Sequence, residues 1–221
     1  MKQFLLLVIF LLVVSCKKAD PPAEESFVYF EKPQPIKDTK LSKIPNKFRG
    51  LFINLDSVYL RISENMIRRE FYRKFRIHKT EIDSLKNVFD FVNGKYVSKD
   101  YKVAFDLIKI GDSVELSHKE IDTVFIFSNT QKAKRFNGKL ILNYSDSIYW
   151  TVNTIAIEKN LLYLKSIGSK DDVKKIDSLS GLKSVQIDSF KFVVKPSRNE
   201  FKTFLNLKRL ETNEGFKKIQ K

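Results

Sequence analysis

Residues 146–152 read Asp-Ser-Ile-Tyr-Trp-Thr-Val, a turn-forming dipeptide followed by an apolar and aromatic run. Asp and Ser side chains close turns by hydrogen bonding to nearby backbone amides, whereas β-branched and aromatic residues favour extended backbone. Each such combination predicts the start of a strand. Alternating or apolar runs also follow Asp56-Ser57, Asp112-Ser113, Asp122-Thr123 and Asp188-Ser189. The chain is therefore expected to consist mainly of short β-strands.

Turn and helix signals between these runs complete the expected fold class. Asn93-Gly94 is a good hairpin turn if its flanks are strands, which favours an antiparallel meander. Ser197-Arg198-Asn199-Glu200 has capping-box spacing directly after Pro196 and predicts a short helix. Helical spacing also follows Ser169 and runs from Thr80 to Val92. We expect a mainly β fold with short helices, of the α+β class.

Three short sequence matches predict two divergent tandem β-rich repeats, residues 48–135 and 136–221. The matches lie in the same order at offsets of 88, 90 and 94 residues, a drift that loop insertions would produce. They pair Phe48-Arg49-Gly50 with Phe136-Asn137-Gly138, the Asp56 turn with the Asp146 turn, and Ile82–Leu85 with Ile176–Leu179. Chance recurrence of a common turn remains the alternative, and the units could form one domain or two.

The first fifteen residues have the organisation of an export signal. Lys2 supplies a positive charge, and Phe4–Val14 is an unbroken apolar run that is too short to span a bilayer. The run ends at Val13-Val14-Ser15-Cys16, which resembles the lipobox of bacterial lipoproteins. The resemblance covers residues 1 to about 20 and implies cleavage before Cys16 by signal peptidase II, followed by lipidation of Cys16. An incidental cysteine after an ordinary signal is the alternative.

The lipoprotein resemblance also implies a location and a tether. The protein is expected in the cell envelope, anchored in the outer membrane, on either the periplasmic or the surface face. Five of the six prolines lie between Cys16 and residue 47, a composition that favours an extended tether over residues 16–47. The apolar cluster at residues 27–30 interrupts this stretch and is expected to dock on the domain. Cys16 is the only cysteine, so the folded part has no disulfide.

The strong positive charge of the chain indicates which kind of partner it would attract. The formal net charge is +15, and such a field favours anionic neighbours. An exported protein meets anionic lipid or acidic polysaccharide rather than nucleic acid. A lysine-rich surface that merely keeps the protein soluble is the alternative.

Arginine is concentrated in residues 67–79, which read IRREFYRKFRIHK. Guanidinium groups bind phosphate or carboxylate bidentately and stack on aromatic rings, so this segment is the candidate anionic contact. The candidate residues are Arg68, Arg69, Arg73, Lys74 and Arg76. The alternative is an amphipathic strand or helix with its apolar side in the core and its arginines in solvent.

Other chemistry is sparse in the sequence. His118, Glu120 and Asp122 would share one side of a strand and could ligate zinc, but they fit a polar strand face or a turn better. No motif for a nucleophile, a phosphate loop or a dinucleotide is present. We therefore expect no cofactor, no metal and no catalytic residue.

Three classes of function follow. The leading hypothesis is a non-enzymatic, lipid-anchored envelope protein that binds a partner within an envelope or surface assembly. The alternative is a binder of anionic lipid or polysaccharide through the 67–79 segment. An enzyme comes third, because it would require a polar cleft that sequence does not reveal.

Overall fold

The computed structural model describes residues 27–167, 173–174, 177–178, 182–206 and 212–219. Within these residues the chain is mainly β with a few short helices, and its strands form one mostly antiparallel sheet. The expected fold class is confirmed at this level. None of the described helices combines the length and the apolar character needed to cross a membrane. The expected signal peptide and Cys16 lie outside the described residues.

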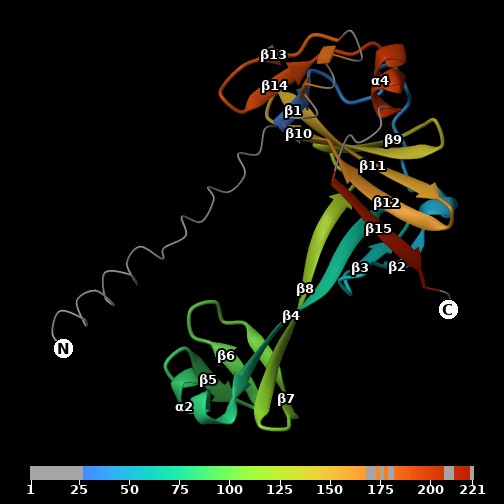
Figure 1. The fold of residues 1–221 in the computed structure, drawn as a ribbon. Helices are drawn as coiled ribbons and strands as arrows, with labels where there is room; N and C mark the ends of the chain where they lie inside the picture. The colour runs from blue at the N-terminus through green and yellow to red at the C-terminus, as the bar shows by residue number, and fades with distance from the viewer. Residues whose placement is uncertain (1–26, 168–172, 175–176, 179–181, 207–211, 220–221) are drawn as a thin grey trace, which may run out of the picture. The chain divides into compact units, whose positions relative to one another are not determined.

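Figure 1 shows the elements along the chain. In order they are β1 (Phe27–Phe30), η1 (Asn46–Phe48), β2 (Gly50–Ile53), β3 (Tyr59–Ile62), β4 (Met66–His78), η2 (Lys79–Glu81), α2 (Ile82–Leu85), β5 (Phe89–Val92), β6 (Lys95–Ser98), β7 (Ala104–Ile110), β8 (Ser113–Ile126), β9 (Gln131–Phe136), β10 (Lys139–Asp146), β11 (Tyr149–Glu158), β12 (Leu161–Ser166), β13 (Val185–Gln186), β14 (Lys191–Val194), α4 (Arg198–Leu205) and β15 (Thr212–Lys218).

The chain forms two compact units, each assembled from separate segments. Among the described residues, unit 1 takes in residues 27–39, 143–153 and those between 165 and 212, and unit 2 takes in residues 40–142, 154–164 and 213–219. The boundaries of these units differ from those of the expected repeats at 48–135 and 136–221. The predicted repeats, each continuous in sequence, therefore do not coincide with the two compact units, each of which combines separate segments.

Unit 1 is built around β1. This strand pairs in parallel with β14, where Phe27 is opposite Lys191, and antiparallel with β11, where Phe30 is opposite Trp150. The Phe30 ring lies 5.9 Å from the ring of Phe201 in α4. The cluster at residues 27–30 thus docks on the fold as expected, because its apolar side chains find a partner helix. The predicted tether over residues 16–47 does not hold for its later part, because Gln34 and Ile44 are buried as well, and its earlier part lies outside the described residues.

Unit 2 contains an antiparallel run of strands in the order β2, β3, β4, β8, β7, β6 and β5. β15 adds to β2 on the other side, with Lys217 opposite Ile53. Buried residues of this unit include Phe52, Leu60 and Phe125, whose neighbours along each strand are less buried, as the period of a strand requires. A second buried cluster lies further along β4 and β8 and is described below.

Four of the five predicted strand starts are confirmed. The Asp56, Asp112, Asp146 and Asp188 dipeptides lie at turns or at the first residue of the following strand. Asp122-Thr123 is a wrong prediction, because both residues lie inside β8 and Thr123 pairs with Arg68. The extended pairing with β4 overrides the local turn preference. The register of the described β4–β8 pairing shifts once, between Ile67 and Arg68, where the partner changes from Phe125 to Thr123.

The helix predictions had mixed outcomes. The Ser197 capping box is present and starts α4. The predicted helix from Thr80 to Val92 is largely wrong, because only α2 and the short η2 form before β5 begins at Phe89. β5 pairs with β6 across Asn93-Gly94, whose φ angles of 51° and 79° suit a hairpin turn. The predicted helix after Ser169 falls mostly outside the described residues.

The matches behind the predicted duplication adopt different structures. Asp56-Ser57 and Asp146-Ser147 both form turns with Ser at a φ near 60°. In contrast, Phe48 ends the helical turn η1, whereas Asn137-Gly138 forms the hairpin turn between β9 and β10. The third match includes Ile176 and Leu179, which lie outside the described residues. The duplication therefore stays a prediction.

Candidate functional site

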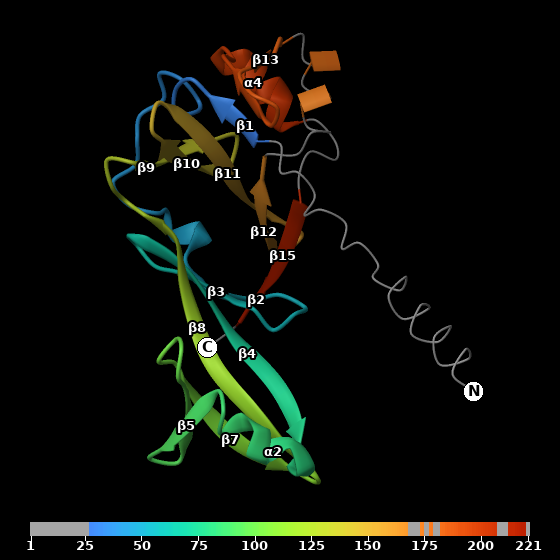
Figure 2. The ribbon, with the colours of Figure 1, turned by 90° about the vertical axis from the view of Figure 1, so that its left-hand side faces the viewer.

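Strands β4 and β8 form a long two-stranded ribbon, which we call the arm. The two strands pair at thirteen positions, from Met66 opposite Ile126 to His78 opposite Ser113. Figure 2 shows both strands continuing past β3 within unit 2 to α2 and β7. Side chains alternate between the two sides of a strand, so the arm has two faces with different chemistry.

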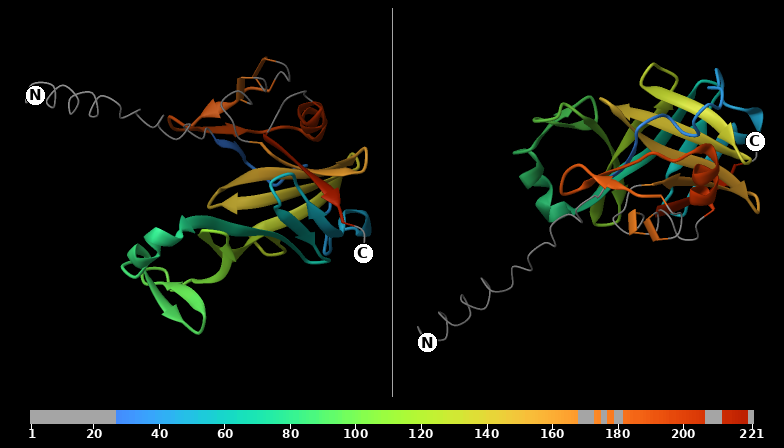
Figure 3. Two further views of the ribbon diagram at one scale, coloured as in Figure 1. Left: turned by 60° about the horizontal axis from the view of Figure 1, so that its bottom comes forward. Right: turned by 90° about the horizontal axis from the view of Figure 1, so that it is seen from above.

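The end of the arm, residues 73–120, carries its own small core and is called the distal arm. Leu85, Phe105, Val114 and Leu116 are buried there, and Phe75 packs against them. The Phe75 ring lies 5.3 Å from the Phe105 ring. These contacts hold α2, β5, β6 and β7 against one face of the ribbon (Figure 3). The distal arm is therefore a packed module rather than a bare hairpin.

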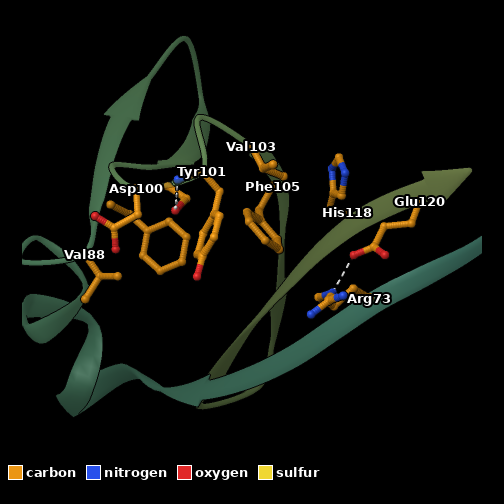
Figure 4. A pocket seen from close by; sticks show the side chains of 10 residues that line it. Arg73, Val88, Asp100, Tyr101, Val103, Phe105, His118 and Glu120 are labelled. Atoms are coloured by element: carbon orange, nitrogen blue, oxygen red, sulfur yellow. Dashed lines mark hydrogen bonds and ion pairs between the residues drawn. The ribbon is translucent and has the colours of Figure 1, made fainter. Parts of the chain in front are cut away.

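The arm pocket is a cavity of about 650 Å³ on the face of the arm that carries this core. Its apolar side is formed by Val88, Phe89, Val103 and Phe105, and Tyr101 stands beside them (Figure 4). The Phe89 and Phe105 rings meet edge to face at 5.6 Å. Such volumes and apolar linings are typical of small-ligand sites.

An ion pair forms one end of the arm pocket. Arg73 of β4 donates from Nε to Oε1 of Glu120 on the neighbouring strand β8 (Figure 4). This hydrogen bond lowers the pKa of Glu120 and raises the pKa of Arg73. Glu120 is therefore a carboxylate at neutral pH, and the pair offers a hydrogen-bond donor and an acceptor side by side.

His118 lies between the ion pair and the aromatic side. Its Nδ1 is 3.0 Å from the carbonyl oxygen of Ala104. A carbonyl oxygen only accepts, so this contact places the hydrogen on Nδ1 and leaves Nε2 of the neutral ring as an acceptor. The ring centre is 5.5 Å from that of Phe105. His118 thus extends the aromatic side and adds an acceptor nitrogen.

The loop between β6 and β7 supplies the remaining lining residues. Ser98 is buried, and its Oγ accepts a hydrogen bond of 3.3 Å from the backbone nitrogen of Tyr101. This contact fixes the start of the loop while the Tyr101 side chain stays 82% exposed. Asp100 is exposed next to it. An aromatic ring and a carboxylate therefore stand at the solvent side of the pocket.

The predicted anionic contact is divided between the two faces of the arm. Arg68, Lys74 and Arg76 are at even positions of β4, whereas Arg69 and Arg73 are at odd positions. Only Arg73 lines the arm pocket. The strand interpretation of this segment is confirmed, and its alternation explains why the five basic candidates do not gather in one place.

Carboxylates of the same chain neutralise much of this segment. Arg69 is 2.7 Å from Glu214 of β15. Lys74 and Arg76 share Glu115 at 3.3 and 3.5 Å. An anionic ligand would have to compete with these carboxylates, so binding of anions by this segment stays a prediction.

The residues weighed as zinc ligands are positioned as expected on one side of β8, but two of them are engaged elsewhere. His118 uses Nδ1 on a carbonyl and Glu120 is paired with Arg73. Within the described residues, no group of three His, Cys, Asp or Glu side chains is placed to hold a metal ion.

The arm pocket could not be predicted from the sequence, because its residues come from four separate segments of the distal arm. Phe89, Tyr101 and Phe105 carry no motif, and only the pairing of β5, β6, β7 and β8 brings them to Arg73. No local signal marks them. No protein-family model, curated protein or solved structure matches this chain.

Proposed function

We propose that this protein is a non-enzymatic, lipid-anchored component of the cell envelope that binds its partner through the distal arm. Cys16, outside the described residues, would carry the lipid and hold the protein at the outer membrane. The distal arm would make the contact. The observation that carries this proposal is the arm pocket together with the exposed apolar side chains near it.

The surface chemistry of the distal arm supports a binding role. Val88, Phe91 and Tyr101 are 48, 63 and 82% exposed. Exposed apolar side chains that cluster on one module are typical of interaction surfaces. Residues 73–120 contain ten Lys and Arg and eight Asp and Glu, which leaves +2 of the total charge of +15. The distal arm thus contributes little to the net positive charge of the protein, because its acidic and basic residues nearly balance.

The protonation state of Glu120 argues against one catalytic role. A general acid must be protonated at the working pH. Glu120 is held ionised by Arg73, which lowers its pKa, so it does not suit that role.

Site-specific photocrosslinking in intact cells tests the proposal. A photoreactive phenylalanine analogue replaces Phe91 in the distal arm. The same analogue at Ile148, which is 73% exposed in unit 1, is the matched control. We expect one discrete crosslinked product from position 91 and none from position 148.

Two outcomes would contradict the proposal. Equal products from positions 91 and 148 would show non-specific proximity, and no product from position 91 or from the analogue at Tyr101 would remove the distal arm as the contact. A Cys16→Ser form of the position-91 protein should lose the product, because its soluble or mislocalised chain no longer meets the partner.

Binding of anionic lipid or polysaccharide is a second candidate, favoured by one observation. Arg68, Lys74 and Arg76 lie at alternating positions of one arm face with Glu115 as the shared carboxylate of the last two. That face keeps a net positive charge. Replacing Arg68, Lys74 and Arg76 by Ser should abolish retention on anionic vesicles, and retention by the wild type should fall steeply with salt. Unchanged retention would dismiss this candidate.

A further inference from the structure

We propose that the arm pocket binds a neutral pyranose, so that the distal arm recognises a glycan of the envelope. This inference rests on the proposed function, because it names the chemistry that the distal arm recognises. It is carried by the side chains of the pocket, which combine aromatic rings with a donor and several acceptors.

The aromatic side of the pocket suits one face of a sugar ring. Phe89, Phe105 and His118 are neighbours along the pocket, with ring centres 5.6 and 5.5 Å apart from one ring to the next. The Phe89 and Phe105 rings are perpendicular and Phe105 is only 7% exposed, so a sugar would stack on one ring face and meet the edge of its neighbour. One face of a pyranose presents C–H groups, which carry a small positive charge. The faces of aromatic rings are negative and attract such groups. Tyr101, standing at the solvent side, can cover the opposite face of the sugar (Figure 4).

The polar groups of the pocket suit adjacent hydroxyls. Arg73 uses Nε on Glu120, which leaves its terminal N–H groups as donors. Oε2 of Glu120 and Nε2 of His118 are acceptors on the same face of the arm. Each sugar hydroxyl can donate one hydrogen bond and accept others, so neighbouring hydroxyls satisfy both kinds of group at once. An aliphatic or aromatic side chain of a peptide would form none of these hydrogen bonds.

The charge of the lining selects a neutral ligand. Asp100 and Glu120 are acidic and Arg73 is the basic member, so the lining carries a net charge of −1 when His118 is neutral. The two carboxylates disfavour a phosphate or an acidic sugar. The guanidinium of Arg73 disfavours a ligand ammonium group at the polar end. A hydroxylated, uncharged ligand is repelled neither by the carboxylates nor by the guanidinium.

The volume of the pocket fits a small part of a glycan. A cavity of about 650 Å³ lies within the usual range for small-ligand sites. One or two sugar residues can occupy such a space, while the rest of the glycan extends past Tyr101 into solvent.

Ligand binding by the lipidated full chain tests the inference. The protein is kept in a polyoxyethylene detergent, because a detergent with a sugar head group would compete. The probes are the methyl glycosides of glucose, galactose, mannose and N-acetylglucosamine, and the cationic comparison is N-acetyl-lysine methylamide. NMR signals of labelled Tyr, Phe and His rings are followed during titration.

At least one glycoside is expected to shift the signals of Tyr101, Phe105 and His118 in a saturable way. Tyr101→Ala should weaken that binding by about tenfold or more, because it removes one aromatic face; a factor of ten corresponds to about 1.4 kcal/mol. Tyr72→Ala is the matched control, since Tyr72 is an exposed tyrosine on the opposite face of the arm, next to Arg73 in sequence. It should leave binding unchanged.

Several results would overturn the inference. These are no saturable shift with any glycoside, binding of the lysine probe in place of the glycosides, or equal losses from Tyr101→Ala and Tyr72→Ala. If these results come with a discrete crosslink from position 91, only the pyranose is wrong and the binding role of the distal arm stands. If the crosslink is missing as well, both proposals fail.

Discussion

Glu70 in the middle of β4 is held between two cations. Its side chain is only 9% exposed, and it accepts from Arg61 of β3 and Lys119 of β8, each at 2.7 Å. The hydrogen bonds from Arg61 and Lys119 lower its pKa to about 2. One side chain thus ties three neighbouring strands together, at a point where both sides of β4 carry many charges.

This pKa predicts how the stability of the protein depends on pH. A depressed carboxylate pKa contributes stability above its unfolded value, about 4.3, and the contribution is lost as the pH falls toward 2. Glu70→Gln should therefore lower the free energy of unfolding by about 1.5–3 kcal/mol at pH 7. The difference from wild type should shrink steadily below pH 4.

Urea unfolding of both proteins between pH 7 and pH 2.5 measures this difference. Glu64→Gln is a control, since Glu64 is exposed and pairs with Lys43 and Arg49 at 3.6 and 3.4 Å. A Glu70 difference that does not change with pH would mean that packing, and not the charge of the carboxylate, is responsible.

At the level of single residues, a turn was predicted correctly where a side chain forms hydrogen bonds with its neighbours in the sequence. Asp188 accepts from the backbone nitrogens of Phe190 and Lys191, as its predicted turn requires. Asp122 has the same kind of neighbours but lies within β8. The burial of Glu70 and the lining role of Tyr101 depend on strand neighbours that are distant in sequence. No local pattern could have identified them.

Among the elements, α4 is the helix whose start the sequence specifies most clearly. Ser197 Oγ accepts from the backbone nitrogen of Glu200, and Glu200 accepts in return from the backbone nitrogen of Ser197 at 2.7 Å. Phe201, Phe204 and Leu205 then bury one side of the helix. The capping box and the buried apolar residues both favour a helix over the same residues, so the helix after Pro196 was predicted correctly.

Loss of the cap should cost a modest amount of stability. Ser197→Ala is expected to lower the free energy of unfolding by about 1 kcal/mol, because one backbone N–H of α4 loses its acceptor. Thr203→Ala, an exposed change in the same helix, should be within about 0.5 kcal/mol of wild type. Chemical denaturation compares the two, and equal losses would show that the cap contributes nothing specific.

The distal arm gives a second prediction at the level of elements. Leu116 is fully buried in its small core, so Leu116→Ala should cost about 2–5 kcal/mol. Because this core is separate, we expect the damage to appear as local opening of the distal arm. Amide hydrogen exchange should accelerate in β5, β6 and β7, while β2 and β3 keep their protection.

Leu60→Ala provides the reverse experiment, since Leu60 is fully buried in β3. It should accelerate exchange in β2 and β3. If both substitutions accelerate exchange everywhere to the same extent, unit 2 opens as one cooperative body and the distal arm is not a separate module.

For the whole molecule, the order of elements was harder to predict than their type. Alternating and turn residues predicted a mainly β chain, and the described residues confirm it. The pairing of strands far apart in sequence, such as β1 with β14, leaves no trace in local composition. The arm pocket depends on such pairing within the distal arm, so fold class was predictable and the pocket was not.

Anchoring is a property of the whole molecule and gives the last prediction. Cells fed labelled palmitate should incorporate it into the wild-type protein and not into Cys16→Ser, because the thiol of Cys16 is the proposed attachment point. Mutating the exposed Ser128→Ala in the described fold is a neutral comparison. Label in the Cys16→Ser protein, or none in the wild type, would contradict the lipoprotein assignment.

Both units are closed by pairings between distant residues, and this has a consequence for the export that we propose. Phe27 is opposite Lys191 and Ile53 is opposite Lys217, so each pairing joins residues 164 positions apart. A chain that crosses a membrane in an unfolded state from its N-terminus delivers β1 and β2 long before β14 and β15 arrive. Contacts of such long range also form slowly. If the protein is exported as proposed, we expect β1 and β2 to remain unpaired until β14 and β15 arrive, a period in which the chain is prone to aggregation.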